Sequence, residues 1–86
     1  MEPVAVRRKR LAHRGRYRGF LESDLVFARF IEHHLDNLDD AQLDRFEALV
    51  DEPDEDVWAW VVGRRPIPAR HDNDVMALMR QVNESA

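Results

Sequence analysis

The stretch from Phe20 to Leu35 constrains the fold of this chain more than any other. Apolar residues recur there every three or four positions, at Leu21, Leu25, Ala28, Ile31 and Leu35, and Phe27 widens the stripe. Such spacing predicts an amphipathic α-helix whose apolar side faces a core. We expect this helix to be the central element of the domain.

The composition agrees with a helical protein. The 86 residues include only 3 glycines and 4 prolines, with 44% hydrophobic and 35% charged residues. A folded chain of this size buries only about 60–65% of its unfolded surface, so its core is thin. We predict an all-α fold, a compact bundle of about five helices. The whole chain, residues 1–86, is expected to form a single domain with a basic N-terminal arm at 1–9 and a frayed tail at 84–86.

One further helix is indicated on each side of the central one. The first covers Val4 to Tyr17, although Gly15 inside it costs about 1 kcal/mol relative to alanine. After the central helix, Asp39 is followed three residues later by Gln42, which is a capping-box pattern. The helix that it starts presents one apolar face, made by Leu43, Phe46, Leu49 and Val50.

Start and stop signals also predict two C-terminal helices. One runs from Pro53 to Val62 and ends at Gly63. It carries Trp58 and Trp60, which cannot both face the same way, so we expect one buried and one near the surface. An extended connector at 66–68 follows, and the last helix starts near Asp72. Its inward residues are predicted to be Val75, Leu78, Met79 and Val82.

The net charge of -4 conceals a strong separation of charge along the chain. Basic residues crowd the first eighteen positions, as Arg7, Arg8, Lys9, Arg10, Arg14, Arg16 and Arg18. The segment from Asp36 to Asp56 is strongly acidic and contains Arg45 as its single base. The charges of such a chain either attract partners of either sign or simply form a solvated surface.

Cysteine is absent and no apolar run reaches the length of a membrane span. The lack of cysteine excludes disulfides, thiolate metal sites and cysteine catalysis. Together these features lead us to expect a soluble cytoplasmic protein.

The pentapeptide Arg18-Gly19-Phe20-Leu21-Glu22 is the best candidate for a functional site. A glycine between opposite charges leaves a spot without a side chain, where the backbone of a partner can come close. The motif holds no nucleophile and no group with a reason to titrate near neutrality, so binding is favoured over catalysis. The alternative is purely structural: Gly19 caps the helix, Glu22 occupies its third position, and Arg18 pairs with Glu22 across one turn.

The order and spacing of several elements resemble the succinate dehydrogenase assembly factor family, over about Arg10 to Val82. These elements are the pentapeptide, the helix that runs on to Glu32-His33-His34-Leu35, the helix with Leu43, Phe46 and Leu49, the segment Glu52-Pro53-Asp54 with Trp58-Ala59-Trp60, the connector Pro66-Ile67-Pro68 and the final Val75-Met76-Ala77-Leu78-Met79-Arg80. Family members are small helical proteins of bacteria and mitochondria that promote covalent attachment of FAD to the dehydrogenase flavoprotein. Gly15, close before the motif, departs from the pattern and obscures the junction of the first two helices.

The resemblance implies a chaperone-like protein rather than an enzyme. Its partner would be the flavoprotein subunit of succinate dehydrogenase, with that of fumarate reductase as a second candidate client. The implied partner-binding residues are Arg18, Gly19, Phe20, Glu22, Arg14, Trp60 and Arg64. FAD would belong to the client, with no cofactor held stably by this chain. The chain is expected to be a monomer in a bacterial cytoplasm, without membrane contact.

Other functions fit the residues less well. The arm Arg7 to Arg10 suffices for weak phosphate contacts, but the chain is acidic and lacks a recognisable recognition helix. An antitoxin-like regulatory role would need a toxin partner. Adjacent His33 and His34 diverge by about 100° on a helix, which disfavours a metal site. Arg64 and Arg65, beside the connector, either grip an anion or lie in a solvated turn.

Overall fold

The computed structural model describes residues 2–16 and 18–85, and within these ranges the chain forms five α-helices and two short 3₁₀ helices. They are α1 (Val4–Arg16), α2 (Leu21–His34), η1 (Leu35–Asn37), α3 (Asp40–Val50), α4 (Asp54–Val61), η2 (Ala69–His71) and α5 (Asp74–Glu84). The all-α prediction is confirmed. Tyr17, the predicted last residue of the first helix, lies outside the described residues.

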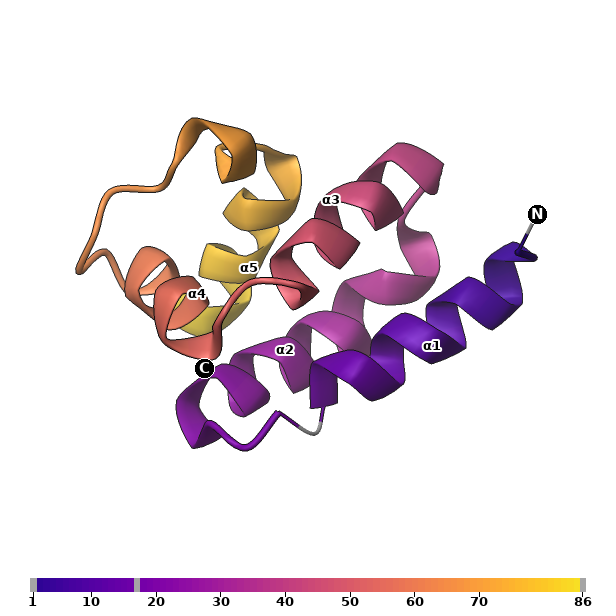
Figure 1. The fold of residues 1–86 in the computed structure, drawn as a ribbon, viewed down its shortest axis with the longest axis horizontal. Helices are drawn as coiled ribbons and strands as arrows, with labels where there is room; N and C mark the ends of the chain where they lie inside the picture. Colours follow the sequence, from indigo (N-terminus) through magenta and orange to yellow (C-terminus); the bar gives the residue numbers. More distant parts are fainter. Residues whose placement is uncertain (1, 17, 86) are drawn as a thin grey trace.

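The long helix α2 occupies the middle of the bundle, as predicted. It packs against α1 on one side and against α4 and α5 on the other (Figure 1). Three phenylalanines tie α2 to α3: Phe46 stacks on Phe30 with ring centroids 4.9 Å apart and meets the edge of Phe27 at 5.9 Å. All three side chains are fully buried, so the aromatic cluster is the centre of the core.

The buried face of α2 agrees only in part with the stripe that the sequence pattern predicts. Phe27, Ile31 and Leu35 are buried as expected. Leu21 and Leu25 are 69% and 50% exposed. The helix instead buries Ser23, Val26, Phe27, Phe30 and Ile31. This choice has a physical reason, since phenylalanine has more apolar area to remove from water than leucine, and the side with both aromatic rings turns inward. The predicted inward positions of Leu21 and Leu25 are therefore wrong.

Gly15 explains how α1 and α2 come so close. It is buried in the last turn of α1, and a Cβ added there would lie 2.9 Å from Cδ1 of Ile31. The missing side chain lets the two helices approach, which offsets the conformational cost of glycine within a helix. The junction with α2 therefore falls after Arg16, with Gly15 inside the first helix.

The predicted capping box of α3 is present. The amide of Gln42 donates to Oδ1 of Asp39 at 2.8 Å, and the amide of Asp39 donates to the Gln42 side chain at 3.0 Å. The four predicted apolar residues of this helix, Leu43, Phe46, Leu49 and Val50, are all buried. Local sequence chemistry thus determines both the start and the orientation of α3.

The two C-terminal helices follow the predictions with one shift. Trp60 is 6% exposed and Trp58 is half-buried, as expected for tryptophans two positions apart. Helix α5 starts at Asp74 instead of near Asp72, because Asn73 is its N-cap and accepts from the amide of Met76 at 3.1 Å. Met76 is consequently buried, whereas Leu78 is only partly covered.

None of the helices in the described ranges combines the length and the apolar character that crossing a bilayer requires.

Candidate functional site

Gly19 lies in an open turn that only glycine adopts easily. Its φ is +88°, in the left-handed region, and no atom lies within 4 Å of the position where a Cβ would be. The residue is exposed, so the predicted notch without a side chain is present at the surface. The N-cap of α2 is Phe20, with extended φ and ψ of -116° and 105°. Gly19 is therefore not the predicted cap, and Glu22 falls at the second helical position instead of the third.

Asp24 holds this turn in place. Its Oδ1 accepts from the amide of Arg18 at 3.2 Å and its Oδ2 from the amide of Gly19 at 3.3 Å. The sequence reasoning missed this residue. An aspartate in the first turn of a helix often accepts hydrogen bonds from nearby backbone amides, which is the signal that would have identified it.

Arg18 turns into the molecule. It donates from Nη1 to the carbonyl oxygen of Val50 at 2.5 Å and from Nη2 to that of Glu52 at 2.7 Å. Its Nε donates to the carboxylate of Asp54. The side chain is 11% exposed and its guanidinium lies 4.9 Å from the ring centre of Phe27. This placement disagrees with both expectations for Arg18, as a contact that faces a partner and as the ion-pair partner of Glu22.

Glu22 points to solvent. It is exposed, and within the described part of the chain its carboxylate has neither a hydrogen-bond nor an ion-pair partner. A carboxylate in the first turn of α2 is compatible with the positive end of the helix dipole, and it remains free to accept from a donor outside the chain. The motif therefore divides into an internal anchor, Arg18, and an exposed surface, Gly19 with Glu22.

The remaining predicted site residues do not form one cluster. Arg14 is about half-exposed and pairs with Asp51, so it contacts the same α3–α4 junction as Arg18. Phe20 is half-buried, and its carbonyl oxygen accepts from Oγ of Ser23 at 3.2 Å. Arg64 is exposed, whereas Trp60 lies in the core with its ring 5.2 Å from that of His71. That position of Trp60 favours a packing role.

The basic arm is helical from Val4 onward and lies against the acidic helix α3. Arg7 contacts Asp44 at 2.5 Å and Glu47 at 3.0 Å, and Arg10 contacts Glu47 at 3.1 Å. We call these four residues the α1–α3 charge seam. Hydrogen bonds from Arg10 and then Arg7 lower the pKa of the Glu47 carboxyl below its ordinary value. The seam shows that much of the charge separation along the sequence is neutralised inside the fold.

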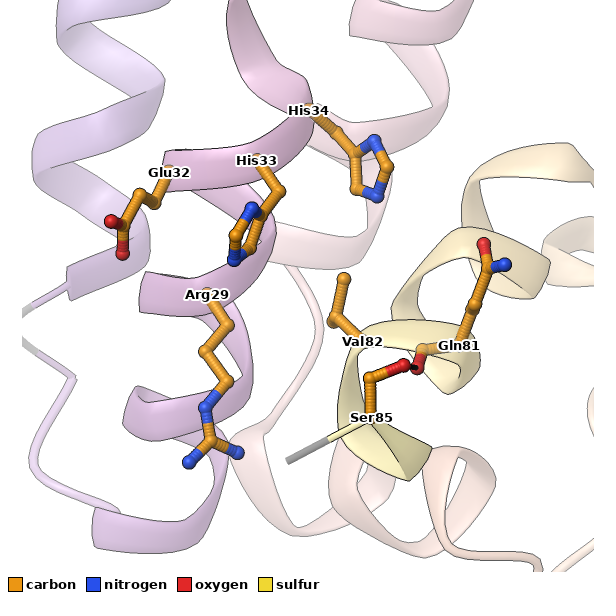
Figure 2. Close-up of a pocket in the computed structure, with 7 residues that line it drawn as sticks. All are labelled: Arg29, Glu32, His33, His34, Gln81, Val82 and Ser85. Atoms are coloured by element: carbon orange, nitrogen blue, oxygen red, sulfur yellow. Dashed lines mark hydrogen bonds between the residues drawn. The ribbon is translucent and has the colours of Figure 1, made fainter.

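A second surface feature lies farther along α2. An open groove of about 580 Å³ separates the C-terminal half of α2 from α5, and is lined by Arg29, Glu32, His33, His34, Gln81, Val82 and Ser85. Figure 2 shows Arg29 and His33 on α2, with Gln81 on α5 and Ser85, just after α5, across the groove. No set of three metal-ligating side chains occurs in residues 2–16 and 18–85. The groove offers hydrogen-bond donors, such as Arg29, together with acceptors, such as Glu32.

Known proteins resemble this chain over most of its length. The closely related sequences include the mitochondrial succinate dehydrogenase assembly factor 2 of Meyerozyma guilliermondii, 39% identical over 84 residues, which cover 93% of this chain and 62% of that protein. The protein of the same name from Aedes aegypti is 36% identical over 81 residues, 92% of this chain and 50% of its own length. That from Mycosarcoma maydis is 51% identical over 61 residues, 71% of this chain and 26% of its own length. The chain thus spans less than two thirds of these relatives.

The relatives also correct one expectation. Their names place them in mitochondria of fungi and insects, so the predicted bacterial cytoplasmic location is wrong. The resemblance that the motif suggested is confirmed independently. A family model described as flavinator of succinate dehydrogenase matches residues 9–83. The chain therefore belongs to the family of succinate dehydrogenase flavinators.

Proposed function

We propose that this chain is an assembly factor that binds the flavoprotein subunit of succinate dehydrogenase and promotes covalent attachment of FAD to it. The observation that carries the proposal is the exposed Gly19 turn beside the unpaired carboxylate of Glu22, in a member of this family. The relatives named above support a mitochondrial setting. The related flavoprotein of fumarate reductase is a second client that the proposal covers.

The geometry supports docking because the exposed half of the motif is held rigidly. Arg18 ties the turn to the α3–α4 junction, and Asp24 holds the two amides that precede α2. A partner backbone can then approach Gly19 without meeting a side chain, and a donor on the partner can reach Glu22. A turn that is already ordered loses little conformational entropy on binding.

In this proposal the chain acts without catalysing a reaction itself. Bond formation between the flavin and its client is the client's own chemistry, and FAD stays with the client. The assembly factor binds more tightly to the client conformation in which the flavin site is ordered, and so increases the population of that conformation. It needs no affinity for FAD to do so.

The experiment is covalent flavin fluorescence of the denatured flavoprotein after incubation with FAD and this chain. We expect fluorescence with the wild type and a clear loss with Glu22→Ala or Gly19→Leu. Asp40→Ala is a matched control, because Asp40 is also an exposed carboxylate in the first turn of a helix. Covalent flavin that does not depend on the wild-type chain would contradict the proposal, and an equal loss with Asp40→Ala would assign the effect of Glu22 to helix stability.

The nucleic-acid alternative loses support from the charge seam. Arg7 and Arg10 are engaged by carboxylates, and Arg8 donates to the carbonyl oxygen of Leu38 at 2.9 Å. Phosphate binding would have to break these contacts in an acidic protein. An antitoxin-like role would use a protein-binding surface as well, and only the identity of the partner separates it from the proposal.

A further inference from the structure

The leucines that the fold leaves exposed lie side by side on α2. Leu21 and Leu25 are one helical turn apart, and both are at least half exposed. Ala28, half-buried, continues the same side of the helix. Single exposed leucines are ordinary on protein surfaces, but an apolar row that begins two residues after Gly19 extends the surface of the motif along α2.

A row of polar residues lies beside this apolar row. Glu22, Arg29 and His33 are spaced by seven and four residues, which places them near one line along the helix. Within the described residues neither Glu22 nor Arg29 has an ion-pair or hydrogen-bond partner. Figure 2 shows Arg29 and His33 one above the other on the side of α2 that borders the groove. We call the six residues of the two rows, Leu21, Glu22, Leu25, Ala28, Arg29 and His33, the outer face of α2.

The charges on this face have an order. The carboxylate lies at the N-terminal end of the outer face and the guanidinium is seven residues along, a rise of about 10 Å. A partner that matches both needs a basic group and an acidic group separated by a similar distance, with apolar side chains between them to cover Leu21 and Leu25. This arrangement distinguishes the face from a purely apolar patch, which would set no orientation.

The outer face of α2 alone is too small to hold any partner stably. A stable interface uses about 20–30 residues on each side, whereas the outer face of α2 offers six. It can therefore only be part of a larger contact. The open Gly19 turn adjoins the outer face of α2 directly. The two surfaces together form a larger contact for the partner that binds the motif.

We propose that the outer face of α2 binds one segment of the client flavoprotein, which carries a basic residue over Glu22, apolar side chains over Leu21 and Leu25, and a carboxylate over Arg29 and His33. This inference rests on the proposed function and extends its interface from the Gly19 turn to the α2–α5 groove. Apolar contacts supply affinity, and the two charges at the ends fix the direction of the segment.

The test measures the dissociation constant of the purified flavoprotein subunit with variants of this chain. We expect the double variant Leu21→Ser with Leu25→Ser to weaken binding by about tenfold or more, as for a central apolar contact. The matched control is Val4→Ser with Val6→Ser, which removes two exposed valines of α1 that are 38% and 52% exposed. That control should bind within about twofold of the wild type, since it lies outside the face.

The charge at the far end is tested separately. Arg29→Glu should slow association and weaken binding by about tenfold at low salt, with a smaller difference at high salt. Arg80→Glu on α5 is the control, because Arg80 is exposed and does not line the groove. Circular dichroism of each variant checks that the helices are intact.

The outcomes separate this inference from the proposed function. If Glu22→Ala weakens binding while the serine double variant and Arg29→Glu bind like the wild type, the α2 inference is overturned and the proposed function stands. If the wild-type chain does not bind the flavoprotein, both fall. If the serine double variant abolishes self-association in sedimentation and leaves client binding unchanged, the occupant is a second copy and the inference is wrong.

Discussion

The α1–α3 charge seam and the outer face of α2 use the same kinds of charged residues in opposite ways. In the seam, Arg7 and Arg10 both meet carboxylates of this chain. On the outer face, neither Glu22 nor Arg29 has an ion-pair partner within the described residues. Charges that are compensated internally hold helices together, whereas uncompensated charges beside exposed leucines remain available to a partner. Pairing in the fold, rather than charge in the sequence, separates the structural charges from the proposed contact residues here.

The same contrast occurs within the motif itself. Arg18 and Glu22 are four residues apart, yet one is 11% exposed and tied to the α3–α4 junction while the other extends into solvent. A motif that looks like one binding unit therefore contains an internal anchor and an exposed carboxylate. Variants that act on only one of the two residues test this division.

The largest effect is expected for Arg18→Ala. This change leaves the carboxylate of Asp54 and the carbonyl oxygens of Val50 and Glu52 without their donor in a partly buried place, which should cost about 2–3 kcal/mol in the free energy of unfolding. Urea denaturation measures this loss. Glu22→Ala should change the same quantity by only about 0.5 kcal/mol or less.

The opposite pattern of stability losses would contradict this division between Arg18 and Glu22. If Arg18→Ala keeps its stability and loses only client binding, Arg18 is a partner contact after all and leaves its internal site when the complex forms.

A smaller loss is expected for Gly19→Ala. No atom lies near the added methyl group, so the cost arises from the backbone, whose φ of +88° is unfavourable for a residue with a Cβ. We expect about 1–2 kcal/mol, measured by denaturation, and less for Gly19→Asn, because asparagine tolerates this region better. Gly63→Ala provides a comparison at a similar φ of +81°, outside the motif. A Gly19→Ala variant as stable as the wild type would show that the turn relaxes.

A weaker effect concerns acid pH. Glu47 has a pKa below its ordinary 4.5 in the folded state, because Arg10 and Arg7 donate to it. Its contribution to stability is therefore present above that value and is lost as the pH falls through the lower, folded-state pKa. Glu47→Gln should lower stability at neutral pH and flatten the loss below pH 4.5, as measured by urea denaturation across pH. An unchanged acid profile would show that the seam does not stabilise the fold.

Sequence reasoning located the helices well because their signals are local. The capping box at Asp39 and the glycine stop at Gly63 act over a few residues, and both are present. The buried side of α2 could not be chosen in this way, because two apolar rows share that helix and only the packing of Phe30 on Phe46 decides between them. A row that is predicted to be buried and is found exposed is then itself a pointer to a binding surface.

The candidate site was only half predictable for a similar reason. The open position of Gly19 and the exposure of Glu22 follow from the motif. The partners of Arg18 lie 32 to 36 residues away in the sequence, at a loop that no spacing rule connects to it. The role of Asp24 depends on a turn that bends back over the start of α2, which the pattern of residues did not reveal.

The smallest effect is expected for Arg14→Ala, and it sharpens the comparison most. Arg14 was predicted to contact the client, and it pairs with Asp51 at the surface, where the two side chains are 41% and 56% exposed. Such a pair contributes about 0.5 kcal/mol or less, so denaturation should hardly detect the change. Because the pair is so weak, a client carboxylate can displace Asp51 at little cost. A loss of client affinity without a loss of stability would then place Arg14 with Glu22 among the contacts, and unchanged affinity would place it with the seam.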